Sequence, residues 1–333
     1  MTQQILLRKF SKFLCLMTFC LIFLGGLVKS TESGLSVPDW PTTYGKFMFA
    51  FPLDQMVGGI KYEHTHRMLA SLVGLLALIQ CIWLLRTPVS PWIRRLGIWA
   101  VVLVVFQGVL GGLTVKFYLP FWLSSLHGVF AQTFFLVVIF IAYGLSEEFI
   151  TRRSNDAAPI DGKFLRFVLI LVGMIYIQLI LGNLMRHTES GLAIPDFPTM
   201  GGMLFPSFSK EWLAGINQWR FDNNLDPVTM GQVHLHLMHR VWALLILLKL
   251  CYIDFLAYKN YLNRPLIMKS LFLLNLAVFL QIMLGISTVL FRKEPITTTC
   301  HVALGALVLA ISFILFLRSS ATTVKDFRFQ LKK

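Results

Sequence analysis

Four of the eight histidines lie near the starts of long apolar segments, where a polar side chain is costly to bury. His66 and His127 belong to the first half of the chain, and His239 and His301 to the second. Neutral imidazole is a common ligand of haem iron, and two imidazoles from facing helices can hold a haem between them. One such histidine alone would more simply be a core residue. Four at related positions favour haem ligation, with one haem in each half.

The two halves differ three residues before the first histidine of each pair. Glu63 precedes His66, whereas His236 precedes His239, and residues three apart share a helix face. A carboxylate in an apolar site can act as a base or stabilise charge. Alternatively, Glu63 is a solvated residue at a helix start, where an acid interacts favourably with the helix dipole. The difference predicts that the first half performs chemistry and the second handles electrons.

An arginine follows the first histidine of each pair, Arg67 in one half and Arg240 in the other. A guanidinium group matches a carboxylate in bidentate geometry, so both arginines are candidates to contact haem propionates. The alternative is that they extend to the membrane surface.

The remaining polar residues of the apolar segments have simpler interpretations. Glutamine recurs in the pattern Gln-x-x-Leu-Gly and is expected to form hydrogen bonds between helices. Two other histidines are expected at the membrane interface and one in an outer loop. The residues are Gln107, Gln178 and Gln281, then His64 and His234, then His187.

Long apolar runs place these residues in a membrane protein. The chain is 56% hydrophobic, with a mean hydropathy of +0.70. Runs of about 18 or more apolar residues predict transmembrane helices. We expect an all-α integral membrane fold with eight such helices, at residues 11–29, 63–86, 94–115, 122–146, 163–185, 232–257, 266–291 and 298–318.

An internal repeat organises the eight helices into two tandem four-helix bundles. Residues 31–42 recur as 188–199 with nine of the twelve positions identical. An even number of helices per copy gives both copies one orientation, which predicts a pseudo-two-fold axis along the membrane normal. We divide the chain into 1–150 and 151–333. The repeated loop has either a structural role or a part in the site, since Gly and Pro make it an ordered turn.

Basic residues indicate the topology. Eighteen lysines and arginines lie on one side of the predicted helices and nine on the other, where the two large loops are. Short cytoplasmic loops collect basic residues, so we expect both termini in the cytoplasm and the histidine sites near the outer face. The basic start followed by an apolar run is interpreted as an uncleaved first helix in a bacterial inner membrane. This distribution also argues against nucleic-acid binding as the explanation of the net charge of +14.

Taken together, the eight helices, Glu63-x-x-His66-Arg67, His127, His239-Arg240, His301 and the loop at 31–42 resemble the haem A synthase family. The resemblance implies conversion of haem O to haem A, in which two successive hydroxylations turn the C8 methyl group into a formyl group. It further implies that His66 and His127 hold the substrate haem, that His239 and His301 hold a haem b cofactor, and that Glu63 is the catalytic carboxylate. The implied partners are haem O and membrane lipid. Haem O synthase, oxidase assembly factors and a homo-oligomer are left open.

One departure from the family concerns cysteine. Many bacterial members carry a cysteine pair in the first outer loop, where this chain has none and Val37-Pro38 stands instead. A thiol step in that loop therefore cannot operate here. The five cysteines lie in or beside predicted helices and are interpreted as small packing residues.

Two other functions compete with the synthase. A dihaem b-type electron-transfer protein explains four histidines but gives Glu63 no role. A transporter built from parallel repeats predicts charged groups near the bilayer midplane, whereas these residues lie near the ends of the helices.

Overall fold

The computed structural model describes residues 2–154 and 160–320. Within these residues, eight helices are long and apolar enough to cross a membrane, as predicted. They are α1 (Thr2–Ser30), α2 (Ile60–Arg86), α3 (Pro91–Lys116), α4 (Phe121–Gly144), α6 (Gly162–His187), α8 (Met230–Asn260), α9 (Pro265–Leu290) and α10 (Pro295–Ser320). Four basic residues used for the topology, Lys325, Arg328, Lys332 and Lys333, lie outside the described residues.

The observed ends of these helices agree with the predicted ones within three residues, except at the start of α1. There the helix begins at Thr2, nine residues before the predicted start, because the charged residues Arg8 and Lys9 interrupt the apolar run without interrupting the helix. Leu7 on this extension is 1% exposed and belongs to the core of the first bundle. Burial of one face therefore extends the helix beyond its apolar part.

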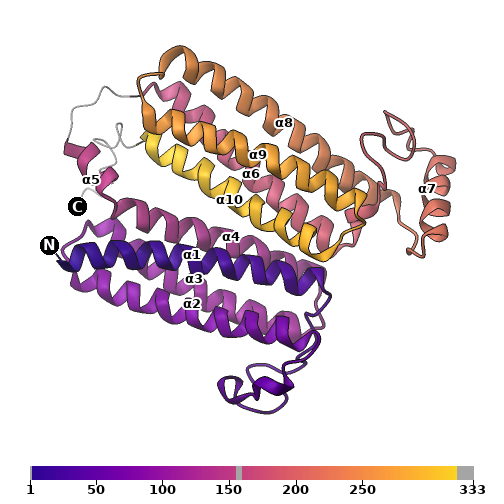
Figure 1. The fold of residues 1–333 in the computed structure, drawn as a ribbon, viewed down its shortest axis with the longest axis horizontal. Coiled ribbons are helices and arrows are strands. Elements are labelled where there is room, and N and C mark those ends of the chain that lie inside the picture. Colours follow the sequence, from indigo (N-terminus) through magenta and orange to yellow (C-terminus); the bar gives the residue numbers. More distant parts are fainter. Residues whose placement is uncertain (1, 155–159, 321–333) are drawn as a thin grey trace, which may run out of the picture.

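Two short helices were not predicted. The first is α5 (Glu147–Ser154) and the second is α7 (Lys210–Asp222), which lies beyond the ends of the membrane helices in Figure 1. The hydroxyl of Ser209 caps α7 by accepting a hydrogen bond from the Trp212 backbone N–H. Trp212 and Ile216 pack in a small apolar core with Ile194 from the preceding loop. Hydropathy alone cannot detect α7 because its outer face is polar.

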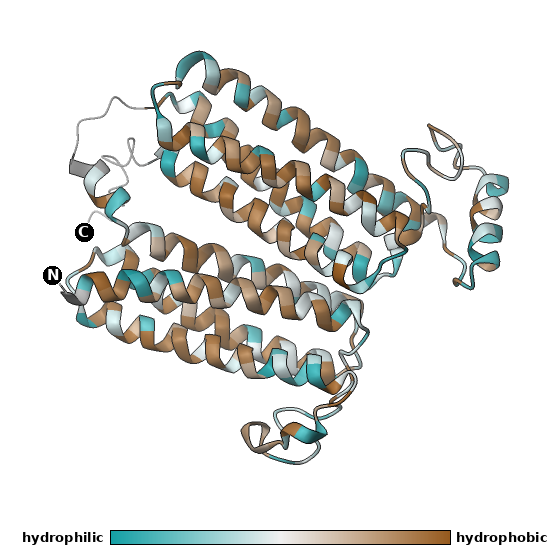
Figure 2. Ribbon diagram, in the orientation of Figure 1, coloured by the Kyte–Doolittle hydropathy of each residue, from teal (hydrophilic) through white to brown (hydrophobic). Residues whose placement is uncertain are grey.

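Three 3-10 turns complete the connections: η1 (Met48–Ala50) and η2 (Leu53–Gln55) in the first large loop, and η3 (Ser190–Leu192) in the second. Both large loops lie at one end of the helices, and the chain begins at the other end (Figure 1). Apolar residues run along the whole length of the membrane helices (Figure 2). Many of them face outward, such as Phe272, which is 68% exposed, and this suits a surface that contacts lipid.

Helices α1–α4 form one bundle, and α6, α8, α9 and α10 form the other (Figure 1). Each bundle has its own apolar core. The seam between them consists mainly of α1 packed on α10 and α4 packed on α6. Exchange of the two halves replaces α1 with α6 and α4 with α10, so each of these two contacts becomes the other. A pseudo-two-fold axis produces this pattern, and the axis itself stays a prediction. The proposed boundary after residue 150 lies within α5.

A buried arginine anchors α7. Arg220 is 6% exposed and donates to the carbonyl oxygens of Leu192, at 2.9 Å, and Asp226, at 2.6 Å. We expect Arg220→Met to leave both carbonyls unpaired, at a cost of about 1–3 kcal/mol each, and so to loosen residues 199–228. Hydrogen exchange of the full chain measures this. The exposed Lys210→Met, at the start of the same helix, is the control, and equal protection in both variants would contradict the anchoring role.

Candidate functional site

The four predicted ligands lie at the same end of the helices. His66, His127 and His301 are each the seventh residue of their helix, and His239 is the tenth. At 1.5 Å per residue, this places them about 9 Å, or 14 Å for His239, from the start of the helix. The structure therefore brings all four to one level of the bundles, near the end that carries the two large loops (Figure 1).

Each histidine packs against a glycine of the preceding membrane helix. A Cβ atom added to that glycine would lie only 3.0–3.3 Å from the Cε1 atom of the imidazole, so a larger residue would push the ring away. Each glycine is five residues before the end of its helix. The pairs are Gly25 with His66, Gly111 with His127, Gly182 with His239 and Gly285 with His301.

These contacts reveal a repeat finer than the predicted halves. The unit is a hairpin of two helices, a glycine on the first and a histidine on the second, and it occurs four times: α1–α2, α3–α4, α6–α8 and α9–α10. Glycines spaced this regularly were present in the sequence, in the pattern Gln-x-x-Leu-Gly. The fourth copy was missed because Leu21 replaces the glutamine before Leu24-Gly25.

The glutamines hold the hairpins together, as predicted. Gln107 Nε2 donates to the backbone oxygen of His127 at 2.9 Å, and Gln178 Nε2 donates to that of His239 at 3.0 Å. Each bond joins the two helices at the level of the histidine. It therefore fixes the height of the imidazole relative to its glycine.

The imidazoles have an unsatisfied nitrogen suited to a ligand. The Nδ1 atoms of all four histidines are buried and have no hydrogen-bond partner within the protein. His66 interacts electrostatically with His127, and His239 with His301, so each bundle holds a pair. Among the described residues, no three His, Cys, Asp or Glu side chains gather into a metal site. A haem held by two imidazoles needs only such a pair, and these residues fit it.

Glu63 lies where the first loop meets the start of α2. It is 3% exposed. Its Oε2 atom accepts a hydrogen bond from the backbone N–H of Val37 at 2.7 Å, and its Oε1 atom forms an ion pair with Arg67 Nη2 at 2.6 Å. The alternative of a solvated carboxylate is therefore wrong, because the loop covers the side chain.

His236 takes the equivalent place in the second half. It is also 3% exposed, with its Nδ1 atom 3.2 Å from the backbone nitrogen of Ile194 and its Nε2 atom 3.2 Å from Arg240 Nε. A neutral imidazole accepts at one nitrogen only, so His236 takes a hydrogen bond from one of these two donors. Loop N–H, side chain and arginine thus form the same chain of contacts as around Glu63. Glu63 and His236 thus occupy equivalent positions in the two halves, with a carboxylate in one and an imidazole in the other.

Both arginines bind carbonyl groups of the repeated loops, and the alternative that they extend to the membrane surface stays a prediction. Arg67 donates to the carbonyls of residues 37, 39 and 42, and Arg240 to those of residues 194, 196 and 199. Contact with a haem propionate stays a prediction. The acceptors occupy Nη1 and Nη2 of Arg67, which leaves Nε for such a contact.

An aspartate closes each loop. Asp39 accepts from the backbone N–H groups of Tyr44, at 2.7 Å, and Gly45, at 2.9 Å, and Asp196 does the same with residues 201 and 202. Desolvation by burial raises the pKa of each carboxyl, but the hydrogen bonds outweigh it and hold both pKa values below the ordinary value. The ionised carboxylates therefore stabilise the loops that cover Glu63 and His236.

The other histidines have varied surroundings. His64 is 3% exposed, with its Nδ1 atom 3.2 Å from Thr43 Oγ1, so the expected place at the membrane interface is wrong: the first loop buries it. His234 is exposed and lies beside Phe208, and its place in a membrane stays a prediction. His187 is the last residue of α6, not part of the loop.

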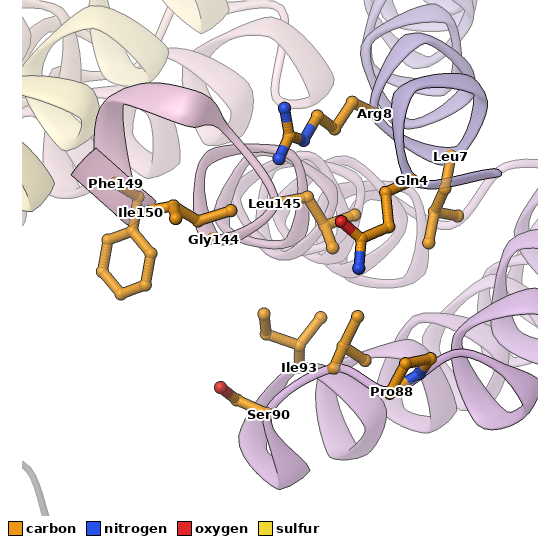
Figure 3. A pocket seen from close by; sticks show the side chains of 11 residues that line it. Gln4, Leu7, Arg8, Pro88, Ser90, Ile93, Gly144, Leu145, Phe149 and Ile150 are labelled. Carbon is orange, nitrogen blue, oxygen red and sulfur yellow. The ribbon is translucent and has the colours of Figure 1, made fainter. Parts of the chain in front are cut away.

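A cavity of about 350 Å³ lies far from these histidines (Figure 3). It is lined by the first turns of α1, the α2–α3 connection and the start of α5. Apolar side chains such as Leu7, Ile93 and Phe149 form most of it, and Arg8 at its edge pairs with Glu147. No histidine lines it, so it is not the haem site.

Glycine at position 182 is expected to be essential for haem binding in the second half. In Gly182→Ala the new Cβ would lie 3.0 Å from His239 Cε1 and displace the ring, which weakens haem retention about tenfold. Gly173→Ala in the same helix is the control, since nothing lies within 4 Å of its Cβ position and the gain in helix propensity is the same. Haem content after purification measures the difference; equal content would contradict this account.

Comparison with known proteins agrees with this arrangement. Heme A synthase of Rickettsia bellii (strain OSU 85-389) is 26% identical over 89% of this chain and 93% of its own. The Heme A synthases of Nitrosomonas eutropha (26%; 89% of this chain and 88% of its own) and Halalkalibacterium halodurans (27%; 87% of each chain) are similar. Residues 8–313 match the COX15-CtaA family, described as cytochrome oxidase assembly protein, and the chain belongs to that family.

Proposed function

We propose that this protein is a haem A synthase, an oxidoreductase that converts the C8 methyl group of haem O into the formyl group of haem A. The observation that carries the proposal is the match over residues 8–313, together with two pairs of histidines seated on glycines at one level of the bundles. Relatives that bear the name Heme A synthase cover nearly the whole chain, including both bundles. The protein is accordingly a multi-pass membrane enzyme that binds haem.

The two halves divide the work. His66 and His127 hold the substrate haem O, and His239 and His301 hold haem b as the cofactor. What supports this division is the single chemical difference between two matching sets of contacts: Glu63 in one, His236 in the other. A carboxylate can accept a proton and stabilise positive charge beside a reacting group. The half that contains Glu63 is therefore the half for the substrate.

Bound haem would supply the redox-active iron, and the protein supplies position and proton transfer. The Val37 N–H and Arg67 each donate to a different oxygen of Glu63, and this fixes the plane of the carboxylate. A carboxylate has about four lone-pair sites, and the backbone of Ser36 is a third hydrogen-bond partner, so about one site stays free to accept a proton. Arg67 offsets the negative charge of Glu63, which lets a carboxylate exist in a buried position.

The competing functions are not favoured. A dihaem electron-transfer protein would have no use for a carboxylate at one of two otherwise matching positions. A transporter with histidine relays needs its ionisable groups near the middle of the membrane. The four histidines lie instead about two turns from the helix ends.

The excess of basic residues supports a bacterial inner membrane with both termini in the cytoplasm and the two sites toward the outer face. Haem O then reaches the protein from the lipid. Haem O synthase and oxidase assembly factors are partners by the same reasoning, and a homo-oligomer is a further proposal.

Co-expression with a source of haem O tests the activity. Extracted haem should contain a new formyl species on chromatography. Glu63→Gln keeps the size of the side chain but loses its charge, so the haem absorption spectrum should persist while product falls at least 100-fold, about the contribution of one acid–base group. Unchanged haem O with the wild-type chain would refute the synthase. Full activity of Glu63→Gln would refute the catalytic role.

Ligand substitutions test the division between the halves. His239→Ala should lose the haem b that the purified protein retains, because a resident cofactor depends on its own ligands. His66→Ala should keep this haem b and lose conversion of haem O. Absorption spectroscopy of both purified variants measures it. The reverse result would assign the cofactor to the first half.

A further inference from the structure

The seam between the halves carries polar contacts from α6 to both α4 and α1. Asn183 of α6 donates from Nδ2 to the backbone oxygen of Ser125 in α4 at 2.7 Å. Arg186, one turn further along α6, donates from Nη2 to the backbone oxygen of Gly26 and, at 2.6 Å, to the hydroxyl of Ser30, both in α1. One helix of the second half thus binds two helices of the first.

The contact of Asn183 ends beside one ligand of the first half. Ser125 is two residues before His127, and Gly128 follows it. A Cβ atom on Gly128 would lie 2.7 Å from Asn183 Nδ2, so the amide lies directly against this backbone. Asn183 therefore contacts α4 both before and after His127 along the chain, and so holds the turn that carries this histidine.

The contact of Arg186 ends beside the other ligand. Gly26 follows Gly25, the residue on which the ring of His66 lies. A guanidinium bound to the Gly26 carbonyl fixes the height of this part of α1 against α6. Arg186 thereby holds the seat of His66 rather than the histidine itself.

The equivalent contacts from the first half to the second are mostly apolar, apart from one hydroxyl pair, in which Thr299 Oγ1 donates to Ser30 Oγ at 3.0 Å. Gly26 takes the place of Asn183 in the repeat, and its Cβ position lies 3.4 Å from Thr299 Cγ2 and 3.7 Å from Val302 Cγ1 of α10. Those two residues correspond to Ser125 and Gly128. The large, polar Asn183 thus lies against the small residues Ser125 and Gly128. At the repeat-related place, the small Gly26 lies against the larger Thr299 and Val302.

Lys29 is the residue of the first half that corresponds to Arg186, and its ion pair does not involve a helix turn that carries a ligand histidine. Lys29 pairs with Glu189, which also pairs with Lys293, at the outer edge of the seam. Two of the three are lysines at least 29% exposed, and exposed ion pairs contribute little to stability. From α1 the segment around His301 therefore receives one hydroxyl contact, between Ser30 and Thr299, in place of a bond to a backbone carbonyl.

We propose that Asn183 and Arg186, which belong to the half for the cofactor, are positioning residues for both ligands of the substrate haem in the other half. This rests on the division proposed above. Loss of the Asn183 contact should change the geometry of the His66–His127 pair and leave the His239–His301 pair unchanged. Arg186 also acts electrostatically on His301 and shares Ser30 with Thr299, so its loss should affect both pairs. The second half would then provide the first with alignment as well as electrons.

The test uses the purified full chain in lipid nanodiscs, loaded first with haem b and then titrated with haem O. Electron paramagnetic resonance distinguishes the two low-spin haems, and His66→Ala assigns the signal of the first half. In Asn183→Ala, that signal should shift and the affinity for haem O should fall about fivefold, as expected for one hydrogen bond, while the other signal stays unchanged. Arg186→Met should lower the affinity for haem O likewise but shift both signals, because Arg186 also interacts with His301. Arg186→Lys, which retains the charge and a donor for Ser30, should recover part of the affinity.

Lys29→Met is the matched control, because it removes a cation at the position that the repeat relates to Arg186. It should change neither signal. Equal shifts of both signals in Asn183→Ala, or no shift in either, would overturn the proposal, since a general packing role predicts the former. Binding and resonance are measured without turnover, so their outcome is separate from the proposed function. That function fails if the wild-type chain forms no formyl haem, whatever the titration shows.

Discussion

An imidazole lying against a glycine is the contact on which the arrangement of the helices depends. It requires the two helices of a hairpin to approach closely at one level, with no side chain between them. The same level recurs four times because each glycine is five residues from the end of its helix. Connections of very different length are accommodated beyond that level: four residues join α3 to α4, whereas the first large loop and the α7 segment are much longer. The ligand geometry is thus set within the membrane helices, independently of the loops.

The loops add a second constraint at the same end. A buried arginine gathers three carbonyl groups of each loop, and the residue three positions before the ligand lies within hydrogen-bond distance of a loop N–H. Two equivalent scaffolds thereby carry different chemical groups at one position. Glu63 can accept from the loop N–H and the arginine at once, whereas the neutral imidazole of His236 can accept from only one of them, so the two positions share a scaffold but not a hydrogen-bonding capacity.

Much of this was predictable from the sequence. Eight helices, the two halves and the four histidines follow from apolar runs and from the repeat, because both are linear patterns. The start of α1 was missed since its extension is stabilised by burial of Leu7, not by hydropathy. The fine repeat was only partly visible, because Leu21 interrupts it. The partners of Arg67 and the burial of His64 could not be predicted, since they depend on how a loop without a periodic pattern folds over the helix start.

Leu21 has a further consequence for the lifetime of a bound molecule. In the hairpins of Gln107 and Gln178 an amide of the first helix donates to the backbone oxygen of the histidine, whereas Leu21 has no side-chain donor for the backbone oxygen of His66. The ring of His66 still bonds the Leu21 backbone, and Gln80 of α2 donates to Ser11 of α1 further along the pair. The backbone of His66 is therefore tied to α1 by one hydrogen bond fewer, a difference of about 1 kcal/mol, or roughly fivefold in local opening. A substrate must depart after each turnover, whereas a cofactor stays, so this looser seat suits the half proposed for the substrate.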